Sequence, residues 1–361
     1  MNLNERKILV VFNPWREYKG SLLEMLVDGL ETNGLQVEYL DILNPPKYEY
    51  NSISDIFRNI YNRTIKKNKQ YILKLENDFV NAFYLKKIKK YKRINDTYFD
   101  YVLIIKPEEF SPNIVKEIVK LGNQSVGYTW DGLRIFLKDN LLKNRKYLNE
   151  IYSFDTNNII DHPELKFKFC TNFAYYNQLK IPYNKRKLDL FFIGDLAGIA
   201  ENQRRDLKLD KFLQNINGSI DINIFLGHAE NRIQKINSKK VKYINSFISL
   251  RESKLITSNT KIVIDVCKAH HIGLSFRFFE CLATETKIIT NNQDVINYDF
   301  YHPNNIMIVD FENEILDQEI YFNFLNLPYE KIEQHILDKY SIENWVKYLF
   351  KIDDYIPITK K

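Results

Sequence analysis

The residues from 273 to 291 combine a glycine turn, a hydroxyl, a cation and a carboxylate around the start of an expected helix. Gly273 interrupts the apolar pattern, Ser275 is a good N-cap, and Arg277 and Glu280 lie one helical step apart. A helix N-terminus presents free N–H groups and the positive end of a dipole, which suit a phosphate. A cation for phosphate and a carboxylate for two ribose hydroxyls are what a nucleotide diphosphate requires. This stretch therefore predicts a site for that ligand.

Two further polar residues, Thr290 and Asn291, end the short apolar strand that follows the expected helix. From the strand end they face the helix N-terminus, where they are candidates to contact the diphosphate or a sugar. Simpler structural roles stay open for the other residues. In that case Arg277 pairs with a nearby carboxylate, Glu280 is an exposed helix residue, and Ser275 only caps the helix.

The segment GLSFRFFECLATETKIITNN, residues 273–292, resembles the donor-site signature of GT-B glycosyltransferases. The resemblance is closest to bacterial lipopolysaccharide and capsular polysaccharide enzymes, which carry Gly-Leu-Ser/Thr-x-Arg-x-x-Glu followed by a Lys-x-Ile-Thr-x-Asn strand. The segments YTWDGL, IYSFD, NYDFYHPNNIMIVD and YSIENWVKYL are similar to parts of the same enzymes, so the resemblance covers most of the chain. Two departures are Glu285, where the group usually has glycine, and the run CKAHHI before Gly273, which affects contacts with the donor sugar.

The resemblance implies an α/β fold with two Rossmann-like, doubly wound parallel-sheet domains that face a deep cleft. It implies transfer of a sugar from a nucleotide-sugar donor to a saccharide or lipid-linked acceptor in bacterial surface polysaccharide biosynthesis. No metal and no other cofactor are expected, because no Asp-x-Asp metal motif follows an expected strand. Two alternatives stay open. One is a nucleotide-sugar epimerase of the same architecture, and the other is a non-catalytic nucleotide- or sugar-binding protein. Glu285, in place of the usual glycine, is the feature that supports the second alternative.

Both halves of the chain begin with the pattern of a parallel α/β sheet. KILVVF at 7–12 is an expected buried strand, and a leucine-patterned helix and a second strand after it predict a βαβ unit. LDLFFIGD at 188–195 begins a second sheet in the same way, with Gly194 near its end. Glycine allows a ligand to approach the backbone closely, so Gly194 is a further candidate for donor binding. Arg204 or Arg205 on the next helix is a candidate to reach a phosphate.

The expected linker between the two domains is IPYNKRK at 181–187, where proline, asparagine and charges separate apolar runs. The prediction is an N-terminal, acceptor-side domain over 1–180 and a C-terminal donor domain over 187–340. The last helix, at 341–353 and capped by Ser341, is expected to pack back on the first domain, as is common in the enzymes that the chain resembles.

Asp131 is the candidate catalytic residue, because it falls at the carboxyl end of the expected strand SVGYTWD, where a cleft should be. Trp130 beside it would raise the carboxylate pKa by desolvation, which suits a general base. In an inverting enzyme Asp131 would deprotonate the acceptor hydroxyl, whereas in a retaining enzyme it would be an acceptor ligand only. The structural alternative is an aspartate that caps the following turn. A similar Trp-Asp pair in the resembling enzymes supports the location without assigning the chemistry.

The net charge of +6 permits an anionic partner but does not choose one. Lys86 and Arg93 bound a basic run that is either a contact with anionic phospholipid or a solvated helix face. No nucleic acid is expected, because no zinc-finger spacing, recognition helix or RNP-like aromatic motif accompanies the charge. Adjacent His270 and His271 point apart in most backbones, which argues against a metal site there.

The expected location is the cytoplasm, with peripheral contact on the inner face of the plasma membrane if the basic run binds lipid. Three cysteines without a CxxC pair argue against a disulfide framework and fit a reducing compartment. The first apolar run is too short for a signal peptide, and no stretch approaches the roughly 18 apolar residues of a membrane span.

Overall fold

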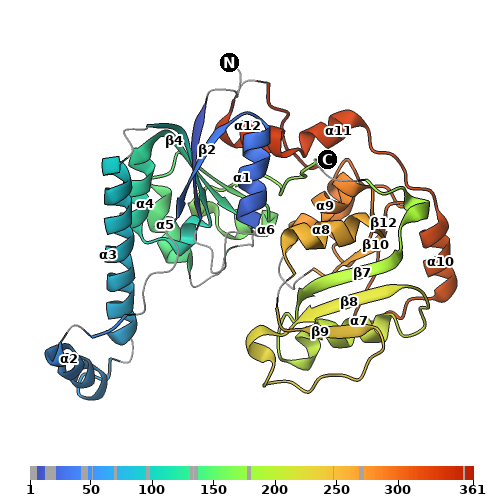
Figure 1. Ribbon diagram of the computed structural model, residues 1–361, viewed down its shortest axis with the longest axis horizontal. Helices are drawn as coiled ribbons and strands as arrows, with labels where there is room; N and C mark the ends of the chain where they lie inside the picture. Colours follow the sequence, from blue (N-terminus) through green and yellow to red (C-terminus); the bar gives the residue numbers. More distant parts are fainter. Residues whose placement is uncertain are drawn as a thin grey trace. The chain divides into compact units, whose positions relative to one another are not determined.

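The computed structural model describes residues 6–12, 22–41, 48–50, 52–68, 71–94, 98–130, 133, 137–176, 180–246, 248–267, 272–352 and 354–361. It contains two six-stranded parallel sheets with surrounding helices (Figure 1). The chain divides into two compact units. The first comprises Met1–Glu17, Glu31–Tyr152 and Glu164–Lys166, and the second comprises Tyr18–Leu30, Ser153–Pro163 and Phe167–Lys361.

The first sheet has the strand order β2-β1-β3-β4-β5-β6. Its strands are β1 (Lys7–Phe12), β2 (Gln36–Asp41), β3 (Phe99–Ile105), β4 (Gly122–Thr129), β5 (Glu150–Ser153) and β6 (Lys168–Phe169). Val10 of β1 lies opposite Tyr39 of β2 and Leu103 of β3, and both pairings are parallel. The continuous apolar run of β1 is buried, as in a parallel sheet covered on both faces. The βαβ unit predicted at the start of the chain is confirmed.

The α-helices described in the first half of the chain are α1 (Leu22–Thr32), α2 (Ile53–Thr64), α3 (Tyr71–Ile94), α4 (Pro112–Ile118), α5 (Lys138–Arg145) and α6 (Thr156–Asp161). The basic run of residues 86–93 lies on α3, where Tyr84, just before the run, and Ile88, within it, are buried. Lys92 in this run pairs with Glu117 at 3.3 Å. Contact of this run with phospholipid stays a prediction. Among the residues described, no helix is both long and apolar enough to cross a membrane.

The second sheet has the order β12-β11-β10-β7-β8-β9. Its strands are β7 (Leu188–Asp195), β8 (Ile220–Phe225), β9 (Val241–Ile244), β10 (Thr260–Asp265), β11 (Lys287–Thr290) and β12 (Ile306–Ile308). Leu190 of β7 lies opposite both Ile220 of β8 and Ile262 of β10. The chain runs outward from β7 through β8 and β9 and then returns to β10 on the other side of β7. The strand order therefore reverses between β7 and β10, and ligands of open α/β sheets bind at such a switch point.

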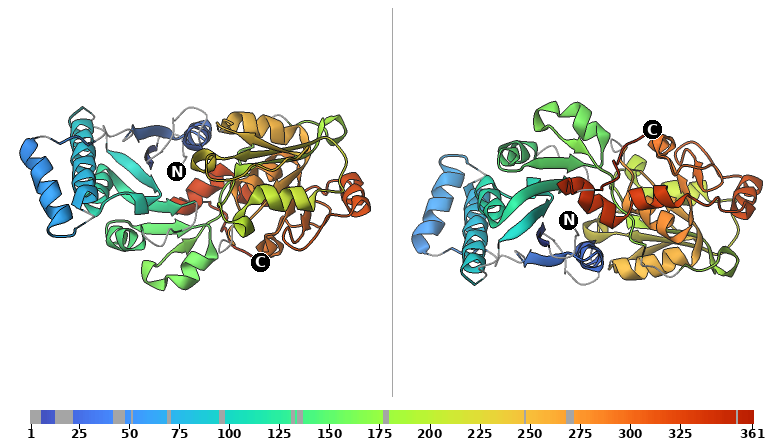
Figure 2. Two further views of the ribbon diagram at one scale, coloured as in Figure 1. Left: turned by 90° about the horizontal axis from the view of Figure 1, so that it is seen from below. Right: turned by 90° about the horizontal axis from the view of Figure 1, so that it is seen from above.

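The helices of the second half are α7 (Arg205–Phe212), α8 (Leu250–Ser258), α9 (Phe276–Thr284), α10 (Gln318–Asn326), α11 (Gln334–Lys339) and α12 (Ile342–Phe350). Alternate strand residues such as Leu190, Ile222 and Ile262 form a core cluster with Phe212 of α7 and Phe324 of α10. Helices α8 and α9 contact β10, and Figure 2 shows these elements from two further directions. The doubly wound α/β fold predicted from the sequence is confirmed.

The last helix, α12, begins at the predicted cap, because the Ser341 hydroxyl accepts a hydrogen bond from the Asn344 N–H at 3.1 Å. Trp345 is fully buried, and its indole N–H donates to the Thr171 carbonyl at 2.9 Å. Gly29 of α1 lies so close to Ile342 that a Cβ there would be 2.4 Å from the isoleucine Cδ1. These partners precede residue 180 in the sequence and belong to the second compact unit.

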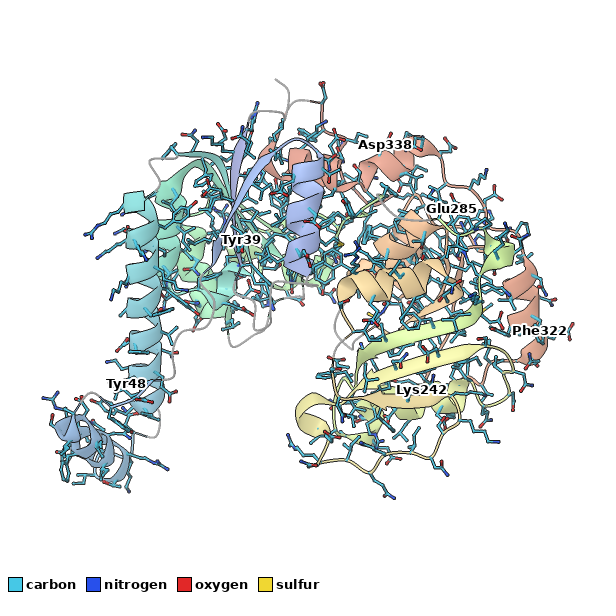
Figure 3. All side chains as sticks on the ribbon, in the orientation of Figure 1. Tyr39, Tyr48, Lys242, Glu285, Phe322 and Asp338 are labelled. Atoms are coloured by element: carbon cyan, nitrogen blue, oxygen red, sulfur yellow. The ribbon has the colours of Figure 1, made fainter. Side chains whose placement is uncertain are left out.

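Glu285 ends α9 in the left-handed conformation, with φ 53° and ψ 43°, and Figure 3 labels it at this helix end. A left-handed residue explains why glycine is usual here in the enzymes that the sequence resembles. We expect Glu285→Gly to have a free energy of unfolding about 1 kcal/mol above that of Glu285→Ala, because only glycine adopts positive φ without steric cost. Both variants lose the 2.9 Å ion pair with Lys180, so urea denaturation compares the backbone effect alone. Equal stabilities would contradict the left-handed assignment.

Lys287 begins β11 with a fully buried side chain, and its ammonium donates to the carbonyls of Phe324 and Leu327. Burial lowers the pKa of Lys287 from 10.5 to about 8. Since the unfolded chain then holds the proton to higher pH, the free energy of unfolding should rise between about pH 8 and 10.5. We expect a rise on the order of 2 kcal/mol that Lys287→Met lacks, measured by urea denaturation across this range. A pH-independent difference between the two proteins would argue against the lowered pKa.

Candidate functional site

Asp265, at the carboxyl end of β10, is the centre of a hydrogen-bond network. Its Oδ1 accepts from the Ser275 hydroxyl at 2.7 Å and from Nη1 of Arg277 at 3.2 Å. Its Oδ2 accepts from the Thr290 hydroxyl at 3.2 Å. Three predicted site residues thus converge on one buried carboxylate that the sequence analysis missed. The available signal was an aspartate at the end of an apolar strand in a parallel sheet, the same signal that singled out Asp131.

The Arg277 side chain connects α9 to β7. Its Nη2 donates to the Ile193 carbonyl, and its guanidinium lies 5.2 Å from the centre of the Phe192 ring. A Cβ on Gly194 would lie 3.3 Å from Nη2 and 2.8 Å from the Phe192 ring, so the glycine makes room for both. The alternative that Arg277 pairs with a nearby carboxylate is confirmed, with Asp265 as the partner. Its side chain remains 23% exposed, and ligand contacts for Arg277 and Gly194 stay predictions.

Ser275 is the N-cap residue of α9, as predicted, with extended backbone angles. The expectation that its side chain caps the helix is wrong, because its hydroxyl makes no capping hydrogen bond and donates to Asp265. The carboxylate is the stronger acceptor and fixes the rotamer of the hydroxyl. The backbone N–H groups of the first turn of α9 therefore donate no hydrogen bond to this side chain.

The loop before α9 is held closely against its surroundings. A Cβ on Gly273 would lie 2.5 Å from the Phe154 ring and 2.7 Å from the Phe154 carbonyl oxygen, so no side chain fits there. The Gly273 carbonyl accepts from Asn292 Nδ2 at 3.4 Å, and the Leu274 carbonyl accepts from Asn172 Nδ2 at 3.0 Å. Both asparagines are buried, and neither was among the site residues predicted from the sequence. The loop that presents the start of α9 is therefore fixed by side-chain amides.

Thr290 and Asn291 connect the end of β11 with the end of β10. Thr290 is fully buried, and its hydroxyl donates to Asp265, so it fixes the Asp265 carboxylate from the buried side. Asn291 Oδ1 accepts from the Cys267 N–H at 2.7 Å. Burial raises the pKa of the Cys267 thiol to about 12, which keeps it neutral at pH 7. Direct contact of Thr290 or Asn291 with a ligand stays a prediction.

Arg204 and Arg205, considered from the sequence as phosphate ligands, are buried and hold other protein groups. Arg205 donates to the Asp195 carboxylate at 2.6 Å and to the Val266 carbonyl at 2.8 Å, which ties the ends of β7 and β10 together. Arg204 forms an ion pair with Asp206. These contacts give both arginines a structural role beside the switch point.

Glu280 is buried on α9, with 8% of the residue exposed. The alternative that it is an exposed helix residue is therefore wrong. Burial raises the pKa of its carboxyl group, and the positive charges of Lys254 and Arg277 partly offset that rise. Among the residues that the structure describes, none donates a hydrogen bond to its carboxylate. A carboxylate on a buried residue that accepts no hydrogen bond from the described residues is suited to accept hydrogen bonds from a ligand.

Asp131 lies outside the described residues, as do His270 and His271. The strand expected to lead to Asp131 is β4, which ends at Thr129. Trp130 follows it and is buried, with its ring centre 5.0 Å from that of Phe12. The catalytic role of Asp131 stays a prediction. Within the described ranges, no group of three or more His, Cys, Asp or Glu side chains is placed to hold a metal ion.

Comparison with known proteins gives matches among solved structures. No family model matches the sequence, and no curated protein matches it. An alpha-glucosyltransferase in complex with UDP and DNA containing an HMU base has a TM-score of 0.53 at 11% identity, covering 95% of each chain. A trehalose-6-phosphate synthase has a TM-score of 0.51 at 11% identity, covering 98% of this chain and 100% of the other. At such identities the likeness shows the fold, and this chain has the GT-B glycosyltransferase fold that its sequence predicted.

Proposed function

We propose that this protein is a glycosyltransferase that transfers a sugar from a nucleotide-sugar donor to a saccharide or lipid-linked acceptor. The observation that carries the proposal is the arrangement at the start of α9. There, Arg277 lies beside the carboxyl ends of β7 and β10, and the buried residue Glu280, whose carboxylate accepts no hydrogen bond from the described residues, follows it on the same helix. The two residues offer a cation and a hydrogen-bond acceptor to one ligand. A nucleoside diphosphate carries the matching anion and ribose hydroxyls.

In this proposal the diphosphate lies at the N-terminus of α9, where backbone N–H groups and the helix dipole favour an anion. Arg277 adds a positive charge, and Glu280 accepts hydrogen bonds from the ribose hydroxyls. Asp265 is a positioning residue, because it holds the Arg277 guanidinium and the Ser275 hydroxyl without reaching the ligand itself. Gly273 lets the loop before the helix keep its close packing.

The proposed reaction is attack of an acceptor hydroxyl on the anomeric carbon of the donor sugar. The bond from that carbon to the diphosphate oxygen breaks, and the nucleoside diphosphate leaves with the electron pair. Arg277 and the helix N–H groups stabilise the developing negative charge, so transfer proceeds without a metal ion. Asp131 takes the proton of the acceptor hydroxyl in an inverting mechanism. The resemblance in sequence supports an acceptor from bacterial surface polysaccharide biosynthesis.

The proposal is tested by mass spectrometry on the purified protein with a panel of nucleotide sugars in the presence of EDTA. We expect one donor to release its nucleoside diphosphate, and this release to be lost in Glu280→Ala and Arg277→Ala. Glu319→Ala and Lys331→Ala are matched controls, because both side chains are exposed in the same unit. An isomerised donor would identify an epimerase, and donor binding without turnover under all conditions would indicate a binding protein.

The acceptor is tested with the donor found in this way, using oligosaccharides, lipid-linked saccharides and duplex DNA. DNA is included because one solved structure of similar fold is an alpha-glucosyltransferase in complex with DNA. We expect transfer to a saccharide or lipid-linked saccharide and none to DNA. Transfer to DNA alone would overturn the proposed acceptor class and leave the donor chemistry standing.

A further inference from the structure

Helix α2 has the reverse of the usual arrangement of polar and apolar residues. Asn59 is its buried residue, and the Asn59 amide donates to the Tyr50 hydroxyl at 2.6 Å. Its large apolar side chains are exposed instead, with Ile53 at 73% and Phe57 at 66%. A helix that packs on a domain normally buries its apolar face. The apolar face of α2 is therefore turned away from the domain that carries it.

The exposed apolar residues form one continuous face. Ile53, Ile56, Phe57, Ile60 and Tyr61 are all exposed and follow the spacing i, i+3, i+4, i+7 and i+8, which places them on a single side of a helix. These five residues are called the apolar stripe below. At about 100° per residue, Asn59 lies outside the stripe, about 130° around the helix from its centre.

Figure 1 and Figure 2 both show α2 beside the N-terminal end of α3. Tyr48, which precedes α2, packs edge-on against Phe79 of α3 with ring centres 5.6 Å apart. These contacts position the helix and leave the apolar stripe uncovered.

The charges around the apolar stripe are almost all positive. Arg58, Arg63, Lys66 and Lys67 are exposed, and Asp55 is the acidic residue between positions 53 and 67. On a helical projection Arg58 and Arg63 lie at the two opposite edges of the stripe. Long cationic side chains at the edges of an apolar face reach phosphates while the face is buried in lipid.

We propose that α2 is a membrane-docking helix that inserts its apolar stripe into the interface of an anionic phospholipid bilayer. An apolar face could be covered by a second copy of this chain or by a lipid surface, and the charge around the stripe distinguishes the two. A second copy of this chain would bring the same cations together, which is repulsive, whereas an anionic lipid surface is complementary to them. The binding does not depend on transferase activity, so it is tested separately from the proposed function.

The basic run of residues 86–93 is not part of this surface. It lies in the C-terminal part of α3, whereas Phe79, against which Tyr48 packs, lies in the N-terminal half. The 24 residues of α3 make it about 36 Å long. The site of membrane contact is therefore assigned to α2, and the lysines of α3 serve as a comparison.

The test is co-sedimentation of the full chain with vesicles of phosphatidylcholine, with and without phosphatidylglycerol. We expect binding to the anionic vesicles that weakens with salt. The triple variant Ile53→Ser, Phe57→Ser, Ile60→Ser should lose about tenfold or more of the partition coefficient, because each side chain would otherwise leave water. Ile320→Ser with Phe322→Ser on α10 is the matched control, since these exposed apolar residues lie on another helix. Binding of this control should equal wild type.

A second comparison separates the two basic regions. The double variant Arg58→Gln, Arg63→Gln should weaken binding to anionic vesicles. The double variant Lys89→Gln, Lys90→Gln should retain most of the wild-type binding. Circular dichroism checks that the variants fold, which exposed substitutions should permit. The proposal is overturned if wild type does not bind, if the triple variant binds equally well, or if the apolar stripe instead mediates a dimer detected by light scattering.

Discussion

Replacing Glu280 by glutamine is expected to lower kcat/KM for the nucleotide-sugar donor by about 100-fold and, at the same time, to stabilise the folded protein. The loss in rate follows because a carboxylate accepts two hydrogen bonds from ribose hydroxyls, and the amide oxygen of glutamine replaces them poorly. A hydrogen bond to a charged group contributes about 1.5–3 kcal/mol, and about 2.7 kcal/mol corresponds to about 100-fold in rate. Initial rates of nucleoside diphosphate release measure the change.

The gain in stability follows from the burial of Glu280. Burial raises the pKa of its carboxyl group above 4.5, so the folded state favours the protonated form. The stability that goes with a raised pKa is fully present below the unfolded pKa and is lost as the pH rises through the folded pKa. Glutamine cannot ionise and avoids this loss. We therefore expect Glu280→Gln to exceed wild type in free energy of unfolding at pH 7, with a smaller difference at pH 4.

The two effects together separate a ligand-binding carboxylate from a structural one. A carboxylate that stabilised the fold through its own contacts would give a glutamine variant that is less stable at pH 7, and that result would contradict the proposed role. Glu319→Gln on α10 is the control, because its side chain is exposed. It should change neither the rate nor the pH dependence of unfolding.

Replacing Arg186 by methionine is expected to destabilise the second unit by about 3 kcal/mol or more. The Arg186 side chain is buried, and it donates to the Ile181 and Thr260 carbonyls at 3.0 and 2.9 Å. It also donates to the Thr286 hydroxyl at 2.9 Å and to the Thr284 carbonyl at 2.6 Å. Methionine fills a similar volume but removes the donor from the three carbonyls, at about 1–3 kcal/mol for each buried group left unpaired. The Thr286 hydroxyl keeps its hydrogen bonds to Thr284 and Thr257.

Hydrogen exchange of the β10 and β11 amides, followed by mass spectrometry, reports the loss in the unit that contains Arg186. Lys187→Met is the matched control, because Lys187 is the next residue in the sequence and its side chain is exposed. This substitution should change the free energy of unfolding by no more than about 0.5 kcal/mol. Unchanged exchange in Arg186→Met would show that water satisfies the same acceptors. Arg186→Lys should recover part of the stability, because an ammonium reaches fewer of them.

The sequence alone determined the fold class, because the relevant signals are local. The apolar runs at 7–12 and 188–195 specify buried parallel strands whatever their partners are, and a helix at leucine spacing follows the first of them. The start of α9 was predictable for the same reason, since a glycine turn, an N-cap residue and a helical pattern are all read within about ten residues. The helix cap at Ser341 was also predicted from local sequence, and it is confirmed.

Only the tertiary structure decided which groups meet. Arg277 reaches the Ile193 carbonyl 84 positions away, and Arg186 reaches the Thr284 carbonyl 98 positions away. Such partners depend on strand order and register, and no local pattern encodes either. The role of Asp265 became visible for this reason, because Ser275, Arg277 and Thr290 come to it from two other elements.

The same reason applies to the sides of helices. Periodicity assigns apolar residues to one face of a helix but does not state which face meets the protein. On α9 the fold turns the carboxylate of Glu280 inward, and on α2 it turns Asn59 inward and leaves Phe57 in solvent. Burial is a property of the whole packing, so the sequence determined the amphipathic elements, and only the tertiary structure decided their orientation, the charge that each buries and the surface that each leaves open.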